Sequence, residues 1–296
     1  MISIKLDTPE GNLEMVVPTQ VKYHVDNSLR VITNPSVYIM GRQTVDDAEL
    51  DRFLSDHGVS WESDSEVAGE VLTETAGRVC YMSFAKPRPG GNAAYLHHIK
   101  EVGHGSVLEH AVWNILITGV SRSLTHELVR HRAGFGFSQL SQRYVDESVA
   151  EYVEPDIIAN DPELHAIWLD AVTHAHAAYI ALADKLNEKL ADAATATAAM
   201  LPPNPDRTTR RKAARQAARS VLPNACETKI FVTGNARALR HFLEMRGSSH
   251  AEPEIRKLSC AVLDALQKDS TNLFGDYKKV PLPDGTFEIV TEFKKV

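Results

Sequence analysis

The segment from Arg130 to Tyr144, RHRAGFGFSQLSQRY, combines cationic, amide and hydroxyl side chains within one short stretch. We expect Arg130, His131 and Arg132 to end a helix, where cations suit the negative end of the helix dipole. That explanation does not cover SQLSQRY, which follows the glycine-containing AGFG. Arginine, glutamine and serine in series offer hydrogen-bond donors suited to a phosphate and to the edge of a heterocycle. The segment is therefore predicted to bind a ligand that carries both.

A second group of polar side chains lies in NARALRHFLEMRGSSH. Arg237 and His241 are one helical turn apart, and so are Arg246 and His250. Asn235 precedes this predicted helix, at the end where free N–H groups and the dipole favour an anion. Each residue alone is explained by capping or by the helix dipole. The five together favour a binding site.

A third group consists of arginines at four-residue spacing on one predicted helix face, Arg207, Arg211, Arg215 and Arg219. A solvated basic face is one interpretation. Like charges at this spacing destabilise a helix slightly, so an anionic partner is the other. Arg219 lies closest to the apolar end of the helix. A nucleic-acid-binding protein that uses the basic helix 207–219 is thus an alternative function, although the net charge of -7 and the lack of an aromatic-rich basic patch argue against it.

Other chemistries lack their usual patterns. His126 and Glu127 do not form a zinc-protease motif, because the next histidine, His131, lies about 140° around the helix from His126. No CxxC pair is present, so no metal site is predicted. There is no GxSxG, and the glycines do not follow the phosphate-binding GxGxxG pattern. The short loop GHGSVLEH (103–110) is a further, weaker ligand-binding candidate.

Composition sets the remaining bounds. The chain has 296 residues, of which 43% are hydrophobic and 24% charged, as in ordinary globular proteins. Its three widely spaced cysteines argue against a disulfide framework and for a reducing, cytoplasmic location. The N-terminus does not resemble a signal peptide, and no apolar stretch approaches the roughly 20 residues that span a bilayer. No membrane association is expected.

The elements that must position these groups alternate along the chain. Strands are expected in the first 40 or so residues, in HAVWNILITGV and in TKIFVTG, and helices between them. Ser123 and Asn92 are expected to cap helices, as are Asp206 and Asn235. This mixture predicts an α+β protein with a central, mostly antiparallel sheet flanked by several helices, in a single domain with an N-terminal extension.

The motifs resemble those of one known family, the flavin-dependent thymidylate synthases. The family signature has Arg-His-Arg, seven or eight residues, then Ser, and this chain has RHR, eight residues, then Ser141 and QRY. GRVCY, GHGSVLEH, ARSVLP, GNARALRHFLEMR and SSHAEPEI also occur in the family's order. The resemblance covers about residues 76–274. It implies a catalytic domain at 66–275, an N-terminal extension at 1–65 and a C-terminal tail at 276–296.

The resemblance also implies the reaction. The family methylates dUMP to dTMP, with 5,10-methylenetetrahydrofolate as carbon donor and NADPH as reductant through FAD. It does not rely on a cysteine nucleophile, so the protein's own contribution is positioning and electrostatics. The family is a homotetramer whose sites form between subunits.

Residue roles follow from the resemblance by position. Arg246 would be catalytic and would stabilise the ionised N3 side of the uracil ring, and His104 matches a position near the flavin ring. The residues implied for dUMP are Glu127, Leu128, Val129, Arg130, Gln139, Leu140, Ser141, Gln142, Arg143, Arg219 and Arg246. The residues implied for FAD are Ser106, Arg130, His131, Arg132, Gln139, Asn235, Ala236, Arg237 and His241.

Three features depart from the family pattern. Glu127 stands where other members have Gln, and we expect its carboxylate to pair with an arginine or to contact the base. His241 replaces an Asn found in some members. The loop after Arg132 carries the longer spacing, so the contacts of residues 133–138 transfer least directly.

Overall fold

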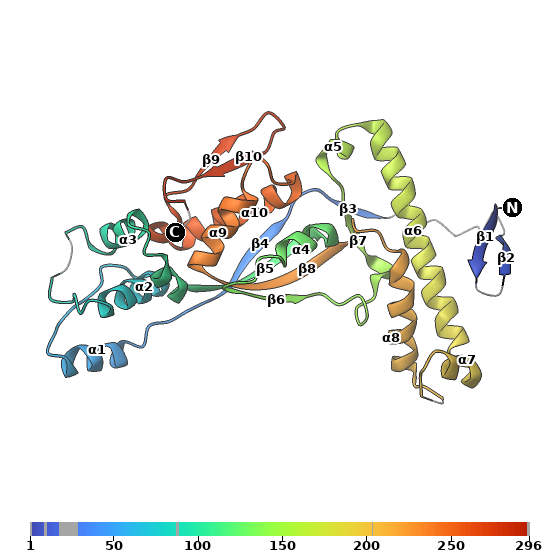
Figure 1. Cartoon of the computed structure of the whole chain (residues 1–296), viewed down its shortest axis with the longest axis horizontal. Coiled ribbons are helices and arrows are strands. Elements are labelled where there is room, and N and C mark those ends of the chain that lie inside the picture. The colour runs from blue at the N-terminus through green and yellow to red at the C-terminus, as the bar shows by residue number, and fades with distance from the viewer. Residues whose placement is uncertain (1, 9–10, 18–28, 87–88, 203, 295–296) are drawn as a thin grey trace. The chain divides into compact units, whose positions relative to one another are not determined.

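The computed structural model describes residues 2–8, 11–17, 29–86, 89–202 and 204–294 (Figure 1). The chain forms two compact units. Unit 1 comprises residues 1–29, 142–149 and 163–223, and unit 2 comprises residues 30–141, 150–162 and 224–296. Part of the predicted N-terminal extension, residues 18–28, lies outside the described residues.

The centre of unit 2 is a four-stranded antiparallel sheet in the order β4-β5-β8-β6. Its strands are β4 (Ser36–Arg42), β5 (Val112–Ser121), β8 (Glu227–Asn235) and β6 (Phe135–Gln139). Alternate residues of β5, including Trp113, Ile115 and Ile117, are buried, as the two-residue period of a strand requires. Strand β4 belongs to this sheet although it lies within the predicted N-terminal extension.

Helices pack on this sheet and around it, which confirms the predicted α+β class. Strands β3 (Arg30–Ile32) and β7 (Glu151–Val153) form a separate parallel pair. The helices of unit 2 are α1 (Asp47–Asp56), α2 (Ala68–Val79), α3 (Gly91–Glu101), η1 (Gly105–His110), α4 (Arg122–Leu128), α5 (Asp156–Ala159), α9 (Ala236–Arg246), α10 (Pro253–Asp269) and α11 (Thr271–Phe274).

The core of unit 2 lies between the sheet and helices α9 and α10. Leu239 and Leu243 of α9, Leu258 of α10, and Ile115 and Ile230 of the sheet are all buried in one hydrophobic cluster. Burial of side chains of this size contributes roughly 1.5–3 kcal/mol each. The cluster therefore fixes α9 on the sheet and, with it, the predicted site residues that α9 carries.

Some helix caps differ from the sequence prediction. Asn235 and Asp206 cap α9 and α8 (Arg207–Ala218) as expected. Helix α4, however, begins earlier than predicted, because Ser121 rather than Ser123 accepts the hydrogen bond from Leu124 N. Asn92 does not cap α3; it is buried and donates to Glu70 and Glu74 instead.

A C-terminal hairpin closes over the link between α9 and α10. Strands β9 (Lys278–Pro281) and β10 (Phe287–Val290) pair antiparallel. Ile289 N donates to Gly247 O at 2.7 Å, and Glu288 accepts from the backbone and side chain of Ser249. A Cβ at Gly247 would lie 2.6 Å from the Cβ of Ile289, so only glycine fits there.

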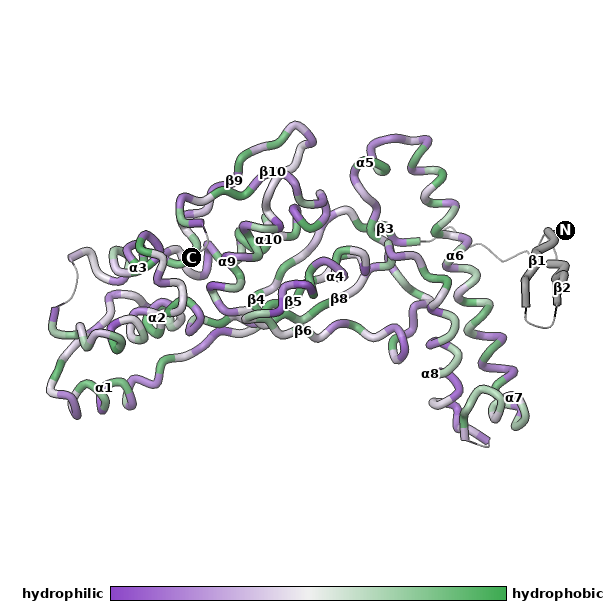
Figure 2. The backbone as a smooth tube through the Cα atoms, in the orientation of Figure 1, coloured by the Kyte–Doolittle hydropathy of each residue, from purple (hydrophilic) through white to green (hydrophobic). Residues whose placement is uncertain are grey.

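Unit 1 is mainly helical. It contains η2 (Glu147–Val149), α6 (Pro162–Lys189), α7 (Ala193–Ala198), α8 and η3 (Arg219–Val221), and a hairpin of β1 (Ile2–Thr8) and β2 (Gly11–Val17). Figure 2 shows hydrophobic and hydrophilic residues alternating along α6, as expected for a helix with one packed side.

Candidate active site

Helix α4 is clamped at its start by a carboxylate from α10. Glu254 accepts hydrogen bonds from both the backbone N and the Oγ of Ser121, each at 2.7 Å. Ser121 in turn caps α4. Burial raises the pKa of Glu254, the largest effect on it. This contact holds a helix of only seven residues in place and so orients Glu127 near its end.

Arg246, at the end of α9, joins two predicted site residues. Its Nη1 donates to the Glu127 carboxylate at 2.7 Å and its Nη2 to the Glu127 carbonyl at 3.3 Å. Its Nε donates to His131 Nε2 at 3.0 Å. The expectation that Glu127 pairs with an arginine is confirmed, and the partner is Arg246. A guanidinium has five N–H groups, so two remain for a ligand.

His131 is held neutral. Burial lowers its pKa to about 4, with the charges of Arg246 and His241 as further causes. Its ring packs edge-on against Phe135, His241 and Phe242, with ring centroids 5.5–6.0 Å apart. Because Nε2 accepts from Arg246, the single proton of the neutral ring belongs on Nδ1. His131 is therefore a neutral hydrogen-bond donor.

The predicted helix end at Arg130–Arg132 is wrong, because α4 stops at Leu128. Arg130 and Arg132 are exposed beyond it, and Arg130 Nε donates back to His126 O at 3.1 Å. The stretch expected to be a ligand-binding loop begins as strand β6, since Phe135–Gln139 pairs with β8. Leu128 is buried in the core, and Val129 is exposed.

The turn between RHR and β6 packs on the start of α9. Gly134 has φ +74, and a Cβ there would lie 2.7 Å from both the Asn235 amide and the Ala238 Cβ. The Asn235 side chain accepts from Ala238 N, and Asn235 N donates to Gly134 O. A glycine is therefore required at this turn, and it brings the RHR segment to the N-terminus of α9.

Other predicted FAD residues lie on η1 and α9, which pack together. Arg237 forms an ion pair with Glu109 of η1 at 2.6 Å, with both side chains about half exposed. Ser106 and His104 are exposed at the start of η1, and Ala236 is buried, with its N–H donated to Ala111 O. The structure thus collects polar groups from three predicted segments on unit 2.

Gln139 has internal partners. Its Nε2 donates to Thr125 Oγ1 at 3.1 Å and to Thr228 Oγ1 at 3.3 Å. Leu140 N donates to Lys229 O at 2.8 Å. These bonds fix the end of β6 directly before Ser141, which is half-buried in unit 2.

The remaining predicted dUMP residues, Gln142, Arg143 and Arg219, belong to unit 1. Gln142 is buried, whereas Arg143 and Arg219 are half-buried. Arg219 is the C-cap residue of α8 and opens η3. Within unit 1, Arg215 donates to Tyr144 O at 2.9 Å and to Asp146 at 2.6 Å.

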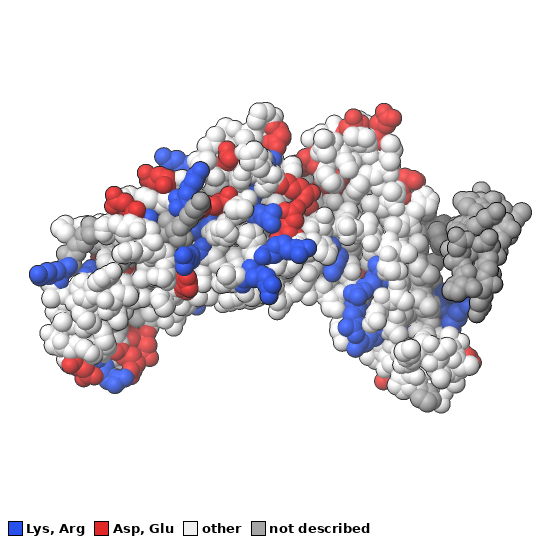
Figure 3. Space-filling model, viewed as in Figure 1, with Lys and Arg blue, Asp and Glu red and all other residues white. Residues whose placement is uncertain are grey.

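The arginines of the basic helix α8 differ in their surroundings. Arg215 is held by Asp146, whereas Arg207 and Arg211 are exposed on a cavity of about 270 Å³. Figure 3 shows basic side chains gathered on this helix. The face is thus partly an internal ion-pair partner and partly solvated.

Sequence reasoning missed Glu252, which directly precedes α10. The neighbouring Glu127 carboxyl is the largest of the causes that raise the pKa of Glu252 to about 7. Burial and the charges of Glu127 and Glu254 act in the same direction. The signal in the sequence was AEPE, two carboxylates a few residues after Arg246.

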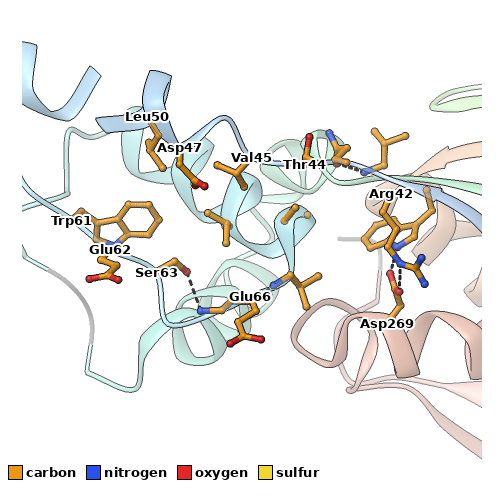
Figure 4. A pocket seen from close by; sticks show the side chains of 18 of the residues that line it. Arg42, Thr44, Val45, Asp47, Leu50, Trp61, Glu62, Ser63, Glu66 and Asp269 are labelled. Carbon is orange, nitrogen blue, oxygen red and sulfur yellow. Dashed lines mark hydrogen bonds and ion pairs between the residues drawn. The ribbon is translucent and has the colours of Figure 1, made fainter. Parts of the chain in front are cut away.

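A larger cavity of about 970 Å³ lies elsewhere in unit 2, between α1, α2 and the end of β4 (Figure 4). Trp61 and Trp113 line it together with several carboxylates. The one cation of its lining, Arg42, is paired with Asp269. None of the predicted site residues lines this cavity, so size alone does not locate the site.

Neither a metal-binding cluster nor a membrane-spanning helix is present among the described residues. No group of three or more histidine, cysteine, aspartate or glutamate side chains is arranged to hold a metal ion there. None of the helices in that part of the chain combines the length and apolarity needed to cross a membrane.

Comparison with known proteins decides the family. Residues 64–270 match the family described as thymidylate synthase complementing protein. This chain belongs to that family.

Relatives of similar length carry one name. The chain is 50% identical over 241 residues to the flavin-dependent thymidylate synthase of Mycolicibacterium gilvum, covering 81% of this chain and 91% of that protein. It is 45% identical over 253 residues to the enzyme of the same name from Corynebacterium diphtheriae, covering 83% and 96%.

Solved structures share the fold. A flavin-dependent thymidylate synthase from Helicobacter pylori, complexed with FAD and dUMP, has a TM-score of 0.52 at 22% identity, covering 81% of this chain and 98% of that chain. A UMP/dUMP methylase from Streptomyces cacaoi has a TM-score of 0.54 at 18% identity, covering 83% and 96%.

Proposed function

We propose that this protein is a flavin-dependent thymidylate synthase, which methylates dUMP to dTMP with 5,10-methylenetetrahydrofolate as carbon donor and NADPH as reductant through FAD. Family membership and the roughly 50% identical relatives of that name support the reaction. The single structural observation that carries it is the Arg246–His131–Glu127 arrangement, because it joins the predicted catalytic, flavin and nucleotide residues.

The residues present fit FAD. Arg130, Arg132 and Arg237 offer guanidinium groups to a diphosphate, and the capped N-terminus of the 11-residue helix α9 favours an anion. Neutral His131 offers an N–H to a heterocycle. Ser106, Gln139, Asn235, Ala236 and His241 would complete the site. When bound, the flavin supplies the hydride chemistry that amino-acid side chains lack.

The role of the protein's own side chains is to bind and orient dUMP. The guanidinium of Arg246 keeps N–H groups for the N3 side of the pyrimidine, where negative charge develops. The nucleotide is held by residues 127–130, residues 139–143 and Arg219, with arginines of this set on the phosphate. Methylation proceeds without a cysteine nucleophile.

The assembly is proposed to be a homotetramer, in the cytoplasm, with sites formed between subunits. The family resemblance is the support for this assembly, in which each site takes residues from more than one copy of the chain. Light scattering of the purified protein measures the assembly directly. A monomer that makes dTMP at full rate would contradict it.

The test of the reaction is spectroscopic and then chemical. The purified protein should take up FAD, turn yellow and be bleached by NADPH in the absence of oxygen. With dUMP and 5,10-methylenetetrahydrofolate added, dTMP should form. A colourless protein that takes up no FAD overturns the proposal. Binding to nucleic acid with steep salt dependence would favour the alternative that uses the basic helix 207–219.

A further inference from the structure

Two arginines of the basic helix α8 have no part in the function proposed above. Arg207 and Arg211 are exposed, one helical turn apart, and no acidic side chain of the described residues pairs with either of them. Like charges at this spacing destabilise a helix. An anion that bridges the two guanidinium groups would therefore stabilise this face of α8.

The same row of arginines begins beside predicted substrate residues of unit 1. Arg219 directly follows α8 and opens η3. Arg215, one turn earlier, donates to Tyr144 O at 2.9 Å, and Tyr144 follows the predicted dUMP-binding residues 142–143. The exposed pair continues the row by two further turns. The row thus leads from residues proposed to hold substrate toward the solvent-exposed start of α8.

A cavity of about 270 Å³ lies beside the row, between α6 and α8 (Figure 1). Three arginines of the row line it, against two aspartates, Asp146 and Asp184. Asp146 is engaged by Arg215 at 2.6 Å, which leaves Arg207 and Arg211 against the exposed Asp184. The excess of positive charge in a hollow surface favours an anionic ligand.

The spacing of the row suits a chain of carboxylates, because four residues of a helix rise by about 6 Å. The proposed co-substrate, 5,10-methylenetetrahydrofolate, ends in a glutamate whose γ-carboxyl can be extended by further glutamates in γ-linkage. Each added unit contributes one free α-carboxylate and five chain bonds of about 1.3–1.5 Å each. Its carboxylates therefore recur at nearly the interval of the arginines, and guanidinium groups pair well with carboxylates.

A short tail also fits the overall charge better than a nucleic acid does. The net charge of the chain is -7, so a long polyanion that extends past α8 is repelled by the rest of the molecule. A tail of a few glutamates meets the arginine row alone.

Resting on the function proposed above, we propose that Arg207 and Arg211 bind the γ-glutamyl tail of the folate co-substrate. The α-carboxylates of the added glutamates pair with the two exposed guanidinium groups, while Arg215 holds α8 to the segment that contains Tyr144. The contact lies away from the reacting atoms. It should therefore lower KM for the folate without changing kcat, and salt should weaken it, as for other exposed charge pairs.

The kinetic test compares KM for the folate with one glutamate and with three. In the wild type the three-glutamate form should have a KM about fivefold lower, because two exposed charge pairs contribute about two- to threefold each. Arg207→Gln combined with Arg211→Gln should bring the ratio of the two KM values to about one. Asp184→Asn removes the opposing carboxylate and should raise the ratio. The exposed Arg52→Gln on α1 is the matched control and should keep the wild-type ratio.

A binding measurement follows the tail without the reaction. Fluorescently labelled penta-γ-glutamate is titrated with the purified full chain in the presence of FAD, and fluorescence anisotropy gives the affinity. The wild type should bind about fivefold more tightly than the double variant, and Asp184→Asn should bind more tightly than the wild type. A single-stranded oligodeoxynucleotide with the same number of charges, titrated in parallel, should bind more weakly than the peptide.

The outcomes separate this proposal from the proposed function. Equal KM values for the two folates in the wild type would overturn the tail site, as would a ratio that persists in the double variant. Tighter binding of the oligonucleotide than of the peptide would assign the face to nucleic acid instead. If no dTMP forms with either folate, the proposed function fails. The peptide titration then decides the tail site alone, with equal affinities of the wild type and the double variant counting against it.

Discussion

Arg240 and Arg246 lie on the same helix, α9, but their surroundings differ. The Arg240 side chain is 0% exposed, and both of its terminal nitrogens are engaged by Asp276, Leu273 O and Phe293 O. The Arg246 side chain is 23% exposed and is held through Glu127 and His131. An arginine whose terminal donors are all used inside the protein serves the fold. One that is fixed yet keeps N–H groups accessible can serve a ligand.

The largest expected effect is on folding, at Arg240. Replacing it with methionine leaves Asp276 with Lys100 as its remaining charged partner at 2.8 Å. Breaking a buried ion pair costs about 3–5 kcal/mol. We expect the free energy of unfolding of Arg240→Met to fall by that amount in denaturant titrations. The exposed Arg52→Met on α1 is the control and should change it by less than about 0.5 kcal/mol. Equal losses of unfolding free energy in Arg240→Met and Arg52→Met would contradict the structural role of Arg240.

Arg246→Lys should leave folding intact and lower turnover, in contrast to Arg240→Met, which should lower stability. A lysine ammonium cannot bridge His131 and Glu127 as the planar guanidinium does, and so cannot hold a fixed charge at the pyrimidine. We expect kcat/KM for dUMP to fall about 100-fold or more. Flavin content and the midpoint of thermal unfolding should stay near wild type. Loss of FAD binding in proportion to loss of dTMP formation would contradict the assigned role.

A smaller effect is expected on the His131 titration. Its pKa is lowered to about 4 by burial first and by Arg246 second. Arg246→Ala removes the neighbouring positive charge and admits water. Both changes should raise the pKa of His131 toward 6.5. Folded His131 binds fewer protons than unfolded His131 between about pH 4 and 6.5, so this residue lowers stability as pH falls through that range. NMR of the imidazole protons measures the pKa, and an unchanged value would show that Arg246 does not act on the ring.

The smallest effect is expected on α8. Arg211→Gln removes an exposed cation and should change the free energy of unfolding by less than about 0.5 kcal/mol. Arg215→Gln breaks bonds to Asp146 and Tyr144 O, so it should cost more, about 1 kcal/mol. Denaturant unfolding of the two variants side by side gives the difference. A larger loss at Arg211 would mean that this face has a partner within the protein.

Motifs and periodicity predicted much of this arrangement. The strand HAVWNILITGV and the capped helix after Asn235 could be read directly, because alternation and capping are local rules. The end of α4 could not, since Arg130–Arg132 suit a helix end by charge while the chain turns at Leu128 toward β6. Local strand propensity could not predict that residues 135–139 pair with β8.

In the candidate site, too, some residues could be predicted from the sequence and others depend on tertiary contacts. The resemblance identified Arg246 and expected an arginine partner for Glu127. It did not identify Glu252, because the nearness of this residue to Glu127 depends on how α10 approaches α4. The clamp of Glu254 on Ser121 sets that approach and is a contact between residues far apart in sequence.

The C-terminal hairpin lies outside the matched family region, yet it bonds to the residue that follows Arg246. Gly247 accepts from Ile289, and Ser249 donates to Glu288, so β10 braces the corner between Arg246 and Glu252. Proteolytic removal of the hairpin would remove the contacts of Ile289 and Glu288 with that corner. Cleavage within residues 278–290 is therefore expected to lower turnover, because it would loosen the corner that places Arg246.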